Sequence, residues 1–486
     1  MRRFDESSAA GTLGRRAFLT AVAAGGGLLL SRGLGVRPVA SESRPRTYEE
    51  VLRELGASMT AKQCALAVFP ADHPTRQIVN TLSVIERPHL GTLFSPAQRV
   101  LIEQLYGTML SEKGRDTFAG TIAVEGRLDG CVLAIYGEPE SGSAQAVIMG
   151  GHLMLRGGQS PAGAAFGGGI AYGHQIGNQL WRVPGNSFAY HGDAANRLYA
   201  WLDADERRRA VLASPPHELV LQPQSHAASF PGVRIGSLSE PAKESAAQVI
   251  DTVFSCYPAA AQAEARSCID ANGGLDSLHV AYYATHGFYS DMSSWGSLDA
   301  GERQRRGDPY WQIWRIEGPG TVVHFKGHPH VHAYIQVVRD PARANYGESL
   351  ATSATTLQGA ALRRLLEAAL RRASGEALAF HGEELPGRFC AGEITTGVAY
   401  SLDPYHNHVV VATIAGGAMA AGLRERLEAG GVVVSPHDRY RVASTDYLVQ
   451  QRSTFGAPER IEPSELLLRD ALVAHLRADG LRQATA

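Results

Sequence analysis

The chain has 486 residues, of which 46 are lysine or arginine and 48 are aspartate or glutamate, so its formal net charge is −2. A chain of this length suits two domains of ordinary size. Because nucleic acids are bound through a basic face that neutralises phosphates, the near-zero charge argues against a nucleic acid polymer as the partner.

Residues 1–40 have the three parts of a secretory signal: Arg15 and Arg16, an apolar stretch that ends at Leu30, and a small-residue exit at Ala40. The run Gly-Arg-Arg-Ala-Phe-Leu resembles the twin-arginine pattern, which directs the export of folded proteins. The apolar stretch is too short and too rich in glycine for a membrane anchor. We therefore expect a periplasmic or secreted protein that meets the twin-arginine export machinery and keeps no stable membrane anchor after cleavage.

The part after this signal is predicted to begin with helices and then to change to strands. Ser95 followed by Pro96 is a typical helix start, because serine caps free N–H groups and proline fits the first turn. The elements expected up to residue 348 are helices within 41–118, strands at 121–124, 131–136 and 146–155, a glycine-rich loop over 156–192, helices at 193–210 and 240–270, and strands at 277–284, 310–317, 321–325 and 331–338.

A second domain is predicted over residues 349–486, after a first domain over 41–348. Its expected elements are helices at 362–372, 419–429 and 465–477, a strand at 409–414 and a short strand that begins at Arg441. Since helices and strands are mixed in both parts, the fold class is α+β or α/β, and the first domain is a mixed β-sheet with helices.

The chain has five cysteines and is expected to enter an oxidising compartment, where cysteines can form disulfides. Cys256 and Cys268 are close in sequence and flank a predicted helical stretch, so we predict that these two pair. The odd number leaves at least one free thiol.

Four histidines stand within nine positions: His324, His328, His330 and His332. On a strand, His330 and His332 point to the same face and reach one metal ion. Neutral imidazole suits zinc, copper, iron or nickel. The alternative is that these histidines make ordinary hydrogen bonds.

Further ligands for such an ion must come from the rest of the first domain. His152, on a predicted strand beside Gly150 and Gly151, is the candidate third ligand, and His328 is a fourth. His324, His174 and His191 are further candidates. The ion is expected to be divalent, either zinc or copper.

Three other polar residues are candidates for catalytic roles. Glu138, in the segment Tyr-Gly-Glu-Pro, is a candidate general base. Arg339 and Asp340 follow the last predicted strand of the first domain, where the arginine is placed to bind an anion and the aspartate to orient a ligand histidine. The alternatives are a solvated turn carboxylate and a plain surface salt bridge.

Two families resemble parts of the chain. Residues 60–345 resemble the uncharacterised bacterial and fungal family DUF3500, through the segments 136–139, 150–153, 196–206, 310–318 and 330–341 in that order. That family usually has Gly-His-His where this chain has Gly151-His152-Leu153. The resemblance implies a shared site at His152, His330 and His332, and it implies no activity.

Residues 355–486 resemble the C-terminal, substrate-binding domain of periplasmic 5′-nucleotidases, through the segments 391–395, 404–410 and 439–448. The resemblance implies substrate contacts from His381, Asn407 and Phe455. Where those enzymes grip the substrate with an arginine, this chain has Pro386, and their two-metal phosphatase motifs are absent from the sequence. Nucleotide hydrolysis by the two-metal route is therefore not expected.

These features predict an exported metal-dependent enzyme, a hydrolase that acts on a small molecule bound between the two domains. One alternative is a copper-type oxidoreductase that uses the same histidines. A second alternative is a non-catalytic ligand-binding protein that keeps a degenerate nucleotidase domain as a scaffold.

Overall fold

The computed structural model describes residues 44–482, apart from 83–84, 86, 125–126, 159, 161–162, 175–186, 285–310, 328–330 and 383–386. The predicted signal peptide therefore lies outside the described residues. None of the helices in the described part of the chain is long and apolar enough to span a bilayer.

A mixed sheet of 11 strands forms the frame of the first part, in the order β1-β2-β3-β4-β5-β11-β10-β9-β8-β6, with β7 paired to β8. Most neighbours are antiparallel, and β1–β2 and β6–β8 are parallel. The strands are β1 Val68–Phe69, β2 Val132–Tyr136, β3 Gln145–Gly150, β4 Leu153–Gly157, β5 Ile170–His174, β6 Val211–Leu212, β7 Val233–Arg234, β8 His279–Tyr283, β9 Ile313–Gly318, β10 Thr321–Lys326 and β11 Val331–Val337.

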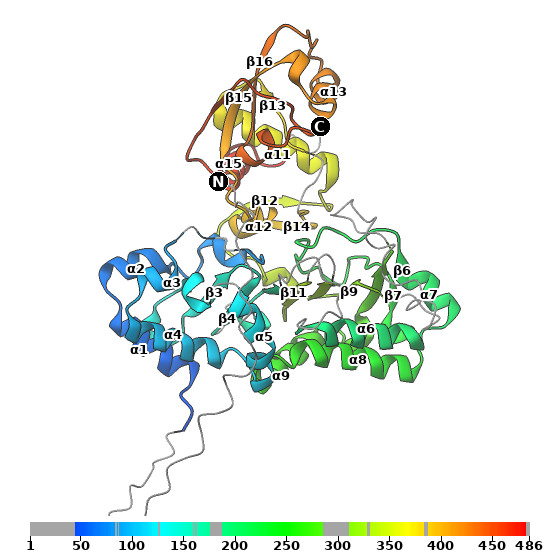
Figure 1. Cartoon of the computed structure of the whole chain (residues 1–486). Helices are drawn as coiled ribbons and strands as arrows, with labels where there is room; N and C mark the ends of the chain where they lie inside the picture. The colour runs from blue at the N-terminus through cyan, green and yellow to red at the C-terminus, as the bar shows by residue number, and fades with distance from the viewer. Residues whose placement is uncertain are drawn as a thin grey trace, which may run out of the picture. The chain divides into compact units, whose positions relative to one another are not determined.

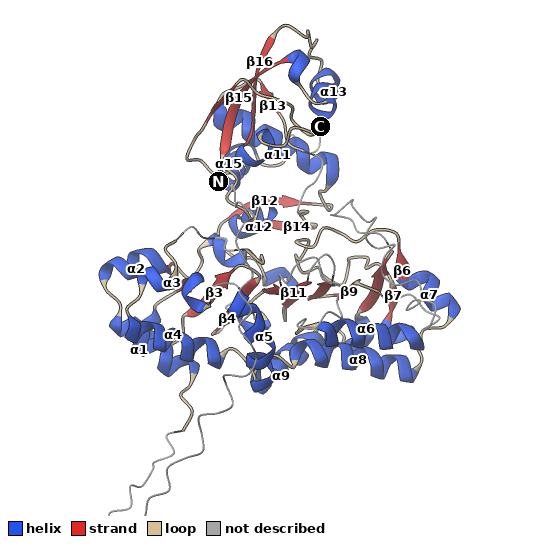
Figure 2. Ribbon diagram, viewed as in Figure 1, coloured by secondary structure: helices blue, strands red, loops and turns tan. Residues whose placement is uncertain are grey.

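Helices cover one face of this sheet, along one side of the strands (Figures 1 and 2). Alternate strand residues such as Ile135, Ile148 and Ile335 join the apolar helix residues in the largest hydrophobic cluster. The helices are α1 Tyr48–Ser58, α2 Ala61–Ala67, α3 Leu90–Leu93, α4 Pro96–Thr108, α5 Glu112–Val124, α6 Ala189–Trp201, α7 Ala204–Ala210, α8 Glu240–Phe254 and α9 Ala259–Ala271. The start of α4 confirms the predicted cap, because Ser95 and Gln98 bond reciprocally to each other's backbone N–H.

The other face carries a second apolar cluster, which includes Val147, Met149 and Tyr334. It is packed by side chains from beyond residue 348, since Tyr400 and Tyr405 lie against it. The Asn80 side chain donates to the carbonyl of Pro404 at 2.9 Å. This face is where the candidate site lies.

Three predictions about local structure were wrong. Residues 121–124 are the last turn of α5, because packing of the helix on the sheet overrides the β-propensity of threonine and valine. Residues 146–155 are two strands, β3 and β4, joined by a tight turn, so His152 lies in a turn and not on a strand. Strand β5 lies inside the segment 156–192 that was expected to be a loop.

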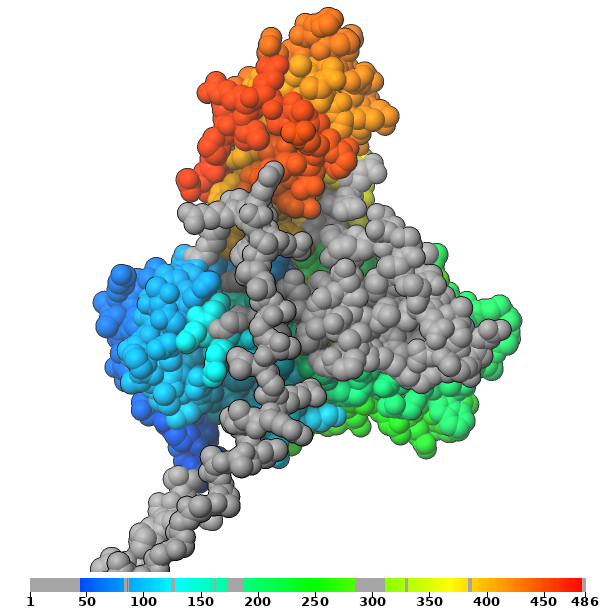
Figure 3. Space-filling view, in the orientation of Figure 1, coloured from blue at the N-terminus to red at the C-terminus, as the bar shows by residue number. Residues whose placement is uncertain are grey.

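The C-terminal part has a four-stranded sheet in the order β13-β16-β15-β17 and a two-stranded sheet of β12 and β14. Figure 3 shows its orange and red residues packed into one continuous body. The α/β class predicted for both parts is confirmed. The elements are β12 Ser349–Ser353, α11 Gly359–Ser374, β13 Leu378–Ala379, β14 Gly392–Thr395, α12 Thr396–Leu402, β15 Val409–Ala415, α13 Ala421–Ala429, β16 Arg439–Thr445, α14 Asp446–Val449, β17 Arg460–Glu462 and α15 Leu468–Asp479.

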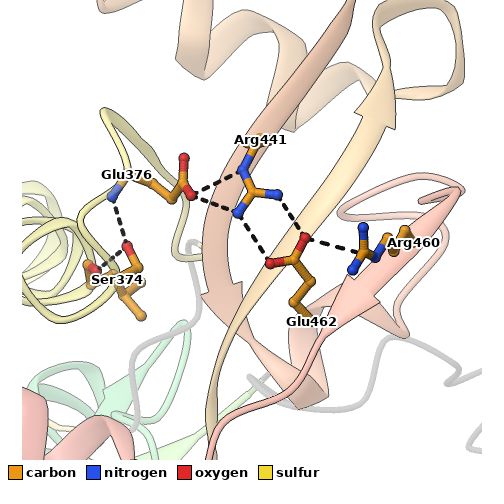
Figure 4. Close-up of polar contacts among 6 residues, drawn as sticks. Ser374, Glu376, Arg441, Arg460 and Glu462 are labelled. Atoms are coloured by element: carbon orange, nitrogen blue, oxygen red, sulfur yellow. Dashed lines mark hydrogen bonds and ion pairs between the residues drawn. The ribbon is translucent and has the colours of Figure 1, made fainter.

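An ion-pair network on the surface links three of these elements (Figure 4). Arg441 on β16 donates to Glu376, which follows α11, at 2.8 and 3.0 Å, and to both carboxylate oxygens of Glu462 on β17. Because these side chains lie at the surface, each pair contributes little to stability. The position of β17 in the sheet is set by its backbone pairing with β15.

The predicted disulfide is absent, and all five cysteines are free thiols. Cys256 lies after α8, with its sulfur 3.1 Å from the Tyr190 hydroxyl. Cys268, on α9, directs its sulfur toward the carbonyl of Gly163. The two thiols therefore have different partners, although they are close in sequence.

Candidate functional site

His152 lies in the two-residue turn between β3 and β4, where Gly150 pairs with Leu153. Its φ of 58° is in the left-handed region, which a residue with a Cβ enters only at a cost of roughly 1–3 kcal/mol. The turn is held on both sides, since the His152 N–H donates to Thr81 at 2.6 Å and its carbonyl accepts from Gly173. A strained histidine that is fixed in this way is typical of functional sites.

His332 comes from β11 and meets His152 across strand β5. The two ring centroids are 5.1 Å apart, with the ring planes inclined by 41°. Gly173, which pairs with His332 in the sheet, leaves the space for both rings. A Cβ built there would lie 3.1 Å from the Cδ2 atom of each ring and 2.2 Å from the carbonyl oxygen of Val331. The pair therefore depends on this glycine.

Glu218 is the carboxylate at the centre of the site. Its two oxygens lie 3.0 and 3.1 Å from Nδ1 of His332, and one of them accepts from Nζ of Lys326 at 2.6 Å. The ring of Tyr334 lies edge-on to that of His332, with the ring centroids 6.2 Å apart. All four side chains are largely buried. Glu218 therefore fixes the ring of His332 and offsets the buried charge of Lys326.

The electrostatics keep Glu218 ionised. Burial raises the pKa of this carboxyl, but His332 and Lys326 outweigh burial and hold the pKa well below its usual range. Burial lowers the pKa of the neighbouring His217 to about 4, against the opposing effect of Glu218. His217 is therefore a neutral imidazole at pH 7, beside a permanent carboxylate.

His152 and His332 are placed as two of the ligands of a metal ion would be. A carboxylate on Nδ1 leaves Nε2 of His332 as the ligand atom, as in many histidine-bound metal sites. Metal–nitrogen bonds of about 2 Å with tetrahedral angles put two bound imidazole centroids about 5 Å apart, close to the separation found for His152 and His332. Over the described ranges, however, no three His, Cys, Asp or Glu side chains form a group that can hold an ion.

The other predicted ligands are distributed differently. His328 and His330 lie outside the described residues. His324 is buried on the same face of the sheet as His332, opposite Arg315 and Tyr334. His191 is on α6 beneath the opposite face, against Tyr172 and Phe188, so it does not meet the pair. His174 ends β5.

The three predicted catalytic residues lie elsewhere. Glu138 is exposed between β2 and a short 3-10 turn. Arg339 and Asp340 follow the end of β11 that is opposite to His332: Arg339 donates to Ser267, and Asp340 caps the backbone of Ala342. Since Asp340 bonds its own chain, it does not orient a histidine of this site, and Glu218 takes that position.

The three residues predicted to contact a substrate have side-chain partners within the protein. His381 is buried, with Nδ1 at 3.2 Å from the Gly382 carbonyl. Asn407 donates to Asp403 at 2.7 Å. Phe455 is 0% exposed and packs against Phe380 in the apolar core. Its ring is therefore a core residue and is not available for the predicted substrate contact.

Three members of the site were missed in the sequence. Glu218 lies in a connecting segment, Gly173 in a glycine-rich stretch, and Lys326 within the histidine-rich segment. None of these belongs to a motif. The pairing of β5, β10 and β11 brings Gly173 and Lys326 to His332, and Glu218 joins them through its side-chain contacts. Only Lys326 had a signal in the sequence: two predicted strands joined by a short connection place it opposite His332.

The family model described as "Protein of unknown function (DUF3500)" matches residues 45–348, which is more than half of the chain. The chain belongs to the DUF3500 family. The match includes both histidines of the pair, Glu218 and Gly173. No curated protein matches the sequence of this DUF3500 protein.

Several solved structures are similar to the DUF3500 protein over about a third of its length. A 5′-nucleotidase precursor from Thermus thermophilus is 12% identical, with 35% of this chain and 47% of that chain covered and a TM-score of 0.24. A putative 5′-nucleotidase from Staphylococcus aureus in complex with alpha-ketoglutarate is 9% identical, with 36% and 49% covered and a TM-score of 0.21. The sulfate thiohydrolase SoxB from Thermus thermophilus in complex with glycerol is 14% identical, with 36% and 43% covered and a TM-score of 0.23. The chain spans less than half the length of each.

Proposed function

We propose that this DUF3500 protein is a metal-dependent hydrolase whose divalent ion, zinc or copper, is bound by His152 and His332. The observation that carries the proposal is the 5.1 Å separation of the two rings, together with Glu218 on the far nitrogen of His332. A strained turn and a glycine that makes room are both difficult to explain for two merely structural histidines.

The third ligand is proposed to be His330, with His328 as the alternative, on the sequence pattern alone. A bound divalent ion supplies either a hydroxide at neutral pH or a Lewis acid that polarises the substrate. The chain's own residues do the rest: Glu218 orients His332, and Lys326 places a positive charge beside it. Hydrolysis is preferred to redox chemistry because the sequence of residues 355–486 resembles a domain of hydrolases.

Metal analysis of protein purified from metal-replete cells tests the proposal. We expect about one ion per chain in the wild type, and loss of the ion in His152→Ala and in His332→Ala. His226→Ala is the matched control, since His226 is exposed and lies near Gly273, after helix α9. Zinc or manganese supports a hydrolase, and copper with a Cu(II) spectrum supports the oxidoreductase. A folded wild type that takes up no metal would leave only the ligand-binding alternative.

We also propose export through residues 1–40. Replacement of Arg15 and Arg16 by lysine is expected to retain the protein in the cytoplasm, because twin-arginine recognition depends on the arginine pair. Replacement of Arg2 and Arg3 by lysine is the matched control and should leave export intact. Cell fractionation measures both, and equal export of the two variants contradicts the proposal.

A further inference from the structure

A small cavity lies where residues 387–401 meet the site-bearing face of the sheet. Its polar lining consists of three amides, a hydroxyl and a guanidinium, from Gln77, Gln222, Gln336, Ser401 and Arg388. Aliphatic side chains of Val79 and of residues 219–221 complete the wall. The described residues of the lining include no carboxylate, so the one full charge among them is positive.

Arg388 has donors that the protein does not use. Its Nε is buried and has no hydrogen-bond partner among the described residues. No carboxylate of the described residues forms an ion pair with it. A buried donor such as this Nε is costly unless a ligand or water satisfies it. The amide of Gln336, which is 7% exposed on β11, lines the same cavity.

A second arginine contacts the wall through Val220, which lines the cavity. Arg315 is 1% exposed, donates through Nε to Glu317 at 2.8 Å and through Nη2 to the carbonyl of Val220 at 2.6 Å. Its Nη1 is buried and has no hydrogen-bond partner among the described residues. The charges of Arg388 and Arg315 oppose burial, which raises the pKa of the Cys390 thiol.

One segment of chain connects this cavity to the histidine pair. Glu218 bonds to His332, the carbonyl of Val220 accepts from Arg315, and Gln222 accepts from the N–H of Cys390 at 3.0 Å. Gln336 and His332 lie on the same face of β11, four residues and therefore about 13 Å apart. A group bound beside Gln336 thus lies within the length of a small organic molecule from the proposed metal centre.

We propose that the cavity is an oxyanion subsite, in which Arg388 and Gln336 bind a carboxylate or phosphate group of an elongated organic anion. The proposal deepens the proposed function by naming its substrate class, but the subsite itself requires no metal. The carboxylate and the phosphate have the same chemistry toward a guanidinium, and the test separates them.

The test is thermal unfolding of the full chain in sodium acetate or sodium phosphate, against sodium chloride at equal ionic strength. An anion that binds only the folded state raises the Tm by mass action, here by about 1–3 °C. We expect the rise in the wild type, its loss in Arg388→Gln and its partial retention in Arg388→Lys. Arg209→Gln, an exposed arginine on α7, is the matched control and should keep the full rise.

Three results decide the proposal. A rise with only one anion identifies the group, and a rise with both leaves the class as a general oxyanion. No rise in the wild type, or an equal rise in Arg388→Gln, overturns the proposal. Circular dichroism and the Tm in chloride establish that each variant is folded. Metal content measured on the same samples should be unchanged in Arg388→Gln, so that failure of the metal proposal and failure of the subsite are distinguishable.

Discussion

Gly173 and His332 are directly paired across strands β5 and β11, and the missing Cβ of the glycine is what allows the rings of His152 and His332 to approach each other. The proposed metal site therefore depends on the residue at position 173 of the sheet as much as on the two histidines.

Gly173→Ala is expected to destabilise the protein by roughly 2 kcal/mol or more and to weaken metal binding. The added Cβ would stand 2.2 Å from the Val331 carbonyl oxygen, which is backbone and moves only with the sheet. Denaturant unfolding and metal content measure the two effects. Gly107→Ala on α4 is the control, because nothing lies within 4 Å of its Cβ, and alanine should stabilise the helix by up to about 1 kcal/mol. Equal stability of the two variants would contradict the prediction.

Glu218→Ala is expected to cost about 3–5 kcal/mol of unfolding free energy, because it removes the carboxylate to which Lys326 and His332 both bond in a buried setting. Glu218→Gln should cost less, since an amide oxygen still accepts. In a double-mutant cycle with Lys326→Met, the coupling should exceed about 1 kcal/mol.

The matched control for this cycle is the exposed pair of Glu240 and Lys243, whose nitrogen and oxygen are 3.2 Å apart. Its coupling should stay below about 0.5 kcal/mol. If the buried pair couples no more strongly than this surface pair, Glu218 does not have the central role assigned to it.

Asp403 should make stability fall as pH rises. Burial raises the pKa of this carboxyl to about 7, against the opposing hydrogen bond from Asn407 and the charge of Arg469. Between the ordinary pKa of 3.8 and about 7, the folded protein holds a proton that the unfolded chain has lost, so the unfolding free energy declines by about 1.4 kcal/mol per pH unit. Urea unfolding from pH 4 to pH 8 measures the slope.

Asp403→Asn is the comparison for that slope. The amide cannot ionise, so the variant should lack this contribution. Its unfolding free energy should therefore rise relative to that of the wild type as pH increases to 8. A wild type and variant with parallel pH profiles would show that Asp403 stays ionised in the folded state.

Phe455→Ala should destabilise the protein by about 3–5 kcal/mol, because the ring is 0% exposed and leaves a cavity against Phe380. Phe455→Leu should cost less. Tyr447→Ala, at a side chain that is 58% exposed, is the control and should change stability by under about 0.5 kcal/mol. Thermal unfolding measures both variants. A Phe455→Ala variant as stable as the wild type would show that the ring is not needed in the core and would restore the predicted substrate contact.

Local patterns were enough to predict much of the fold. The cap at Ser95, the strand expected at 321–325 and the strand expected at 409–414 all depend on neighbours within a few residues, and the structure contains each of them. The predictions were wrong where tertiary packing overrides local preference, as at Thr121 in α5.

For the candidate site, too, local patterns and tertiary contacts contributed different parts. The sequence by itself pointed to the histidine-rich segment at 324–332 and to the glycine-flanked His152, because residue type and spacing are local properties. Only the tertiary structure decided that His152 meets His332, that Gly173 makes room for both and that Glu218 orients one of them. Those contacts join segments of chain far apart in sequence, and they arise from strand pairing and burial, which no local pattern encodes.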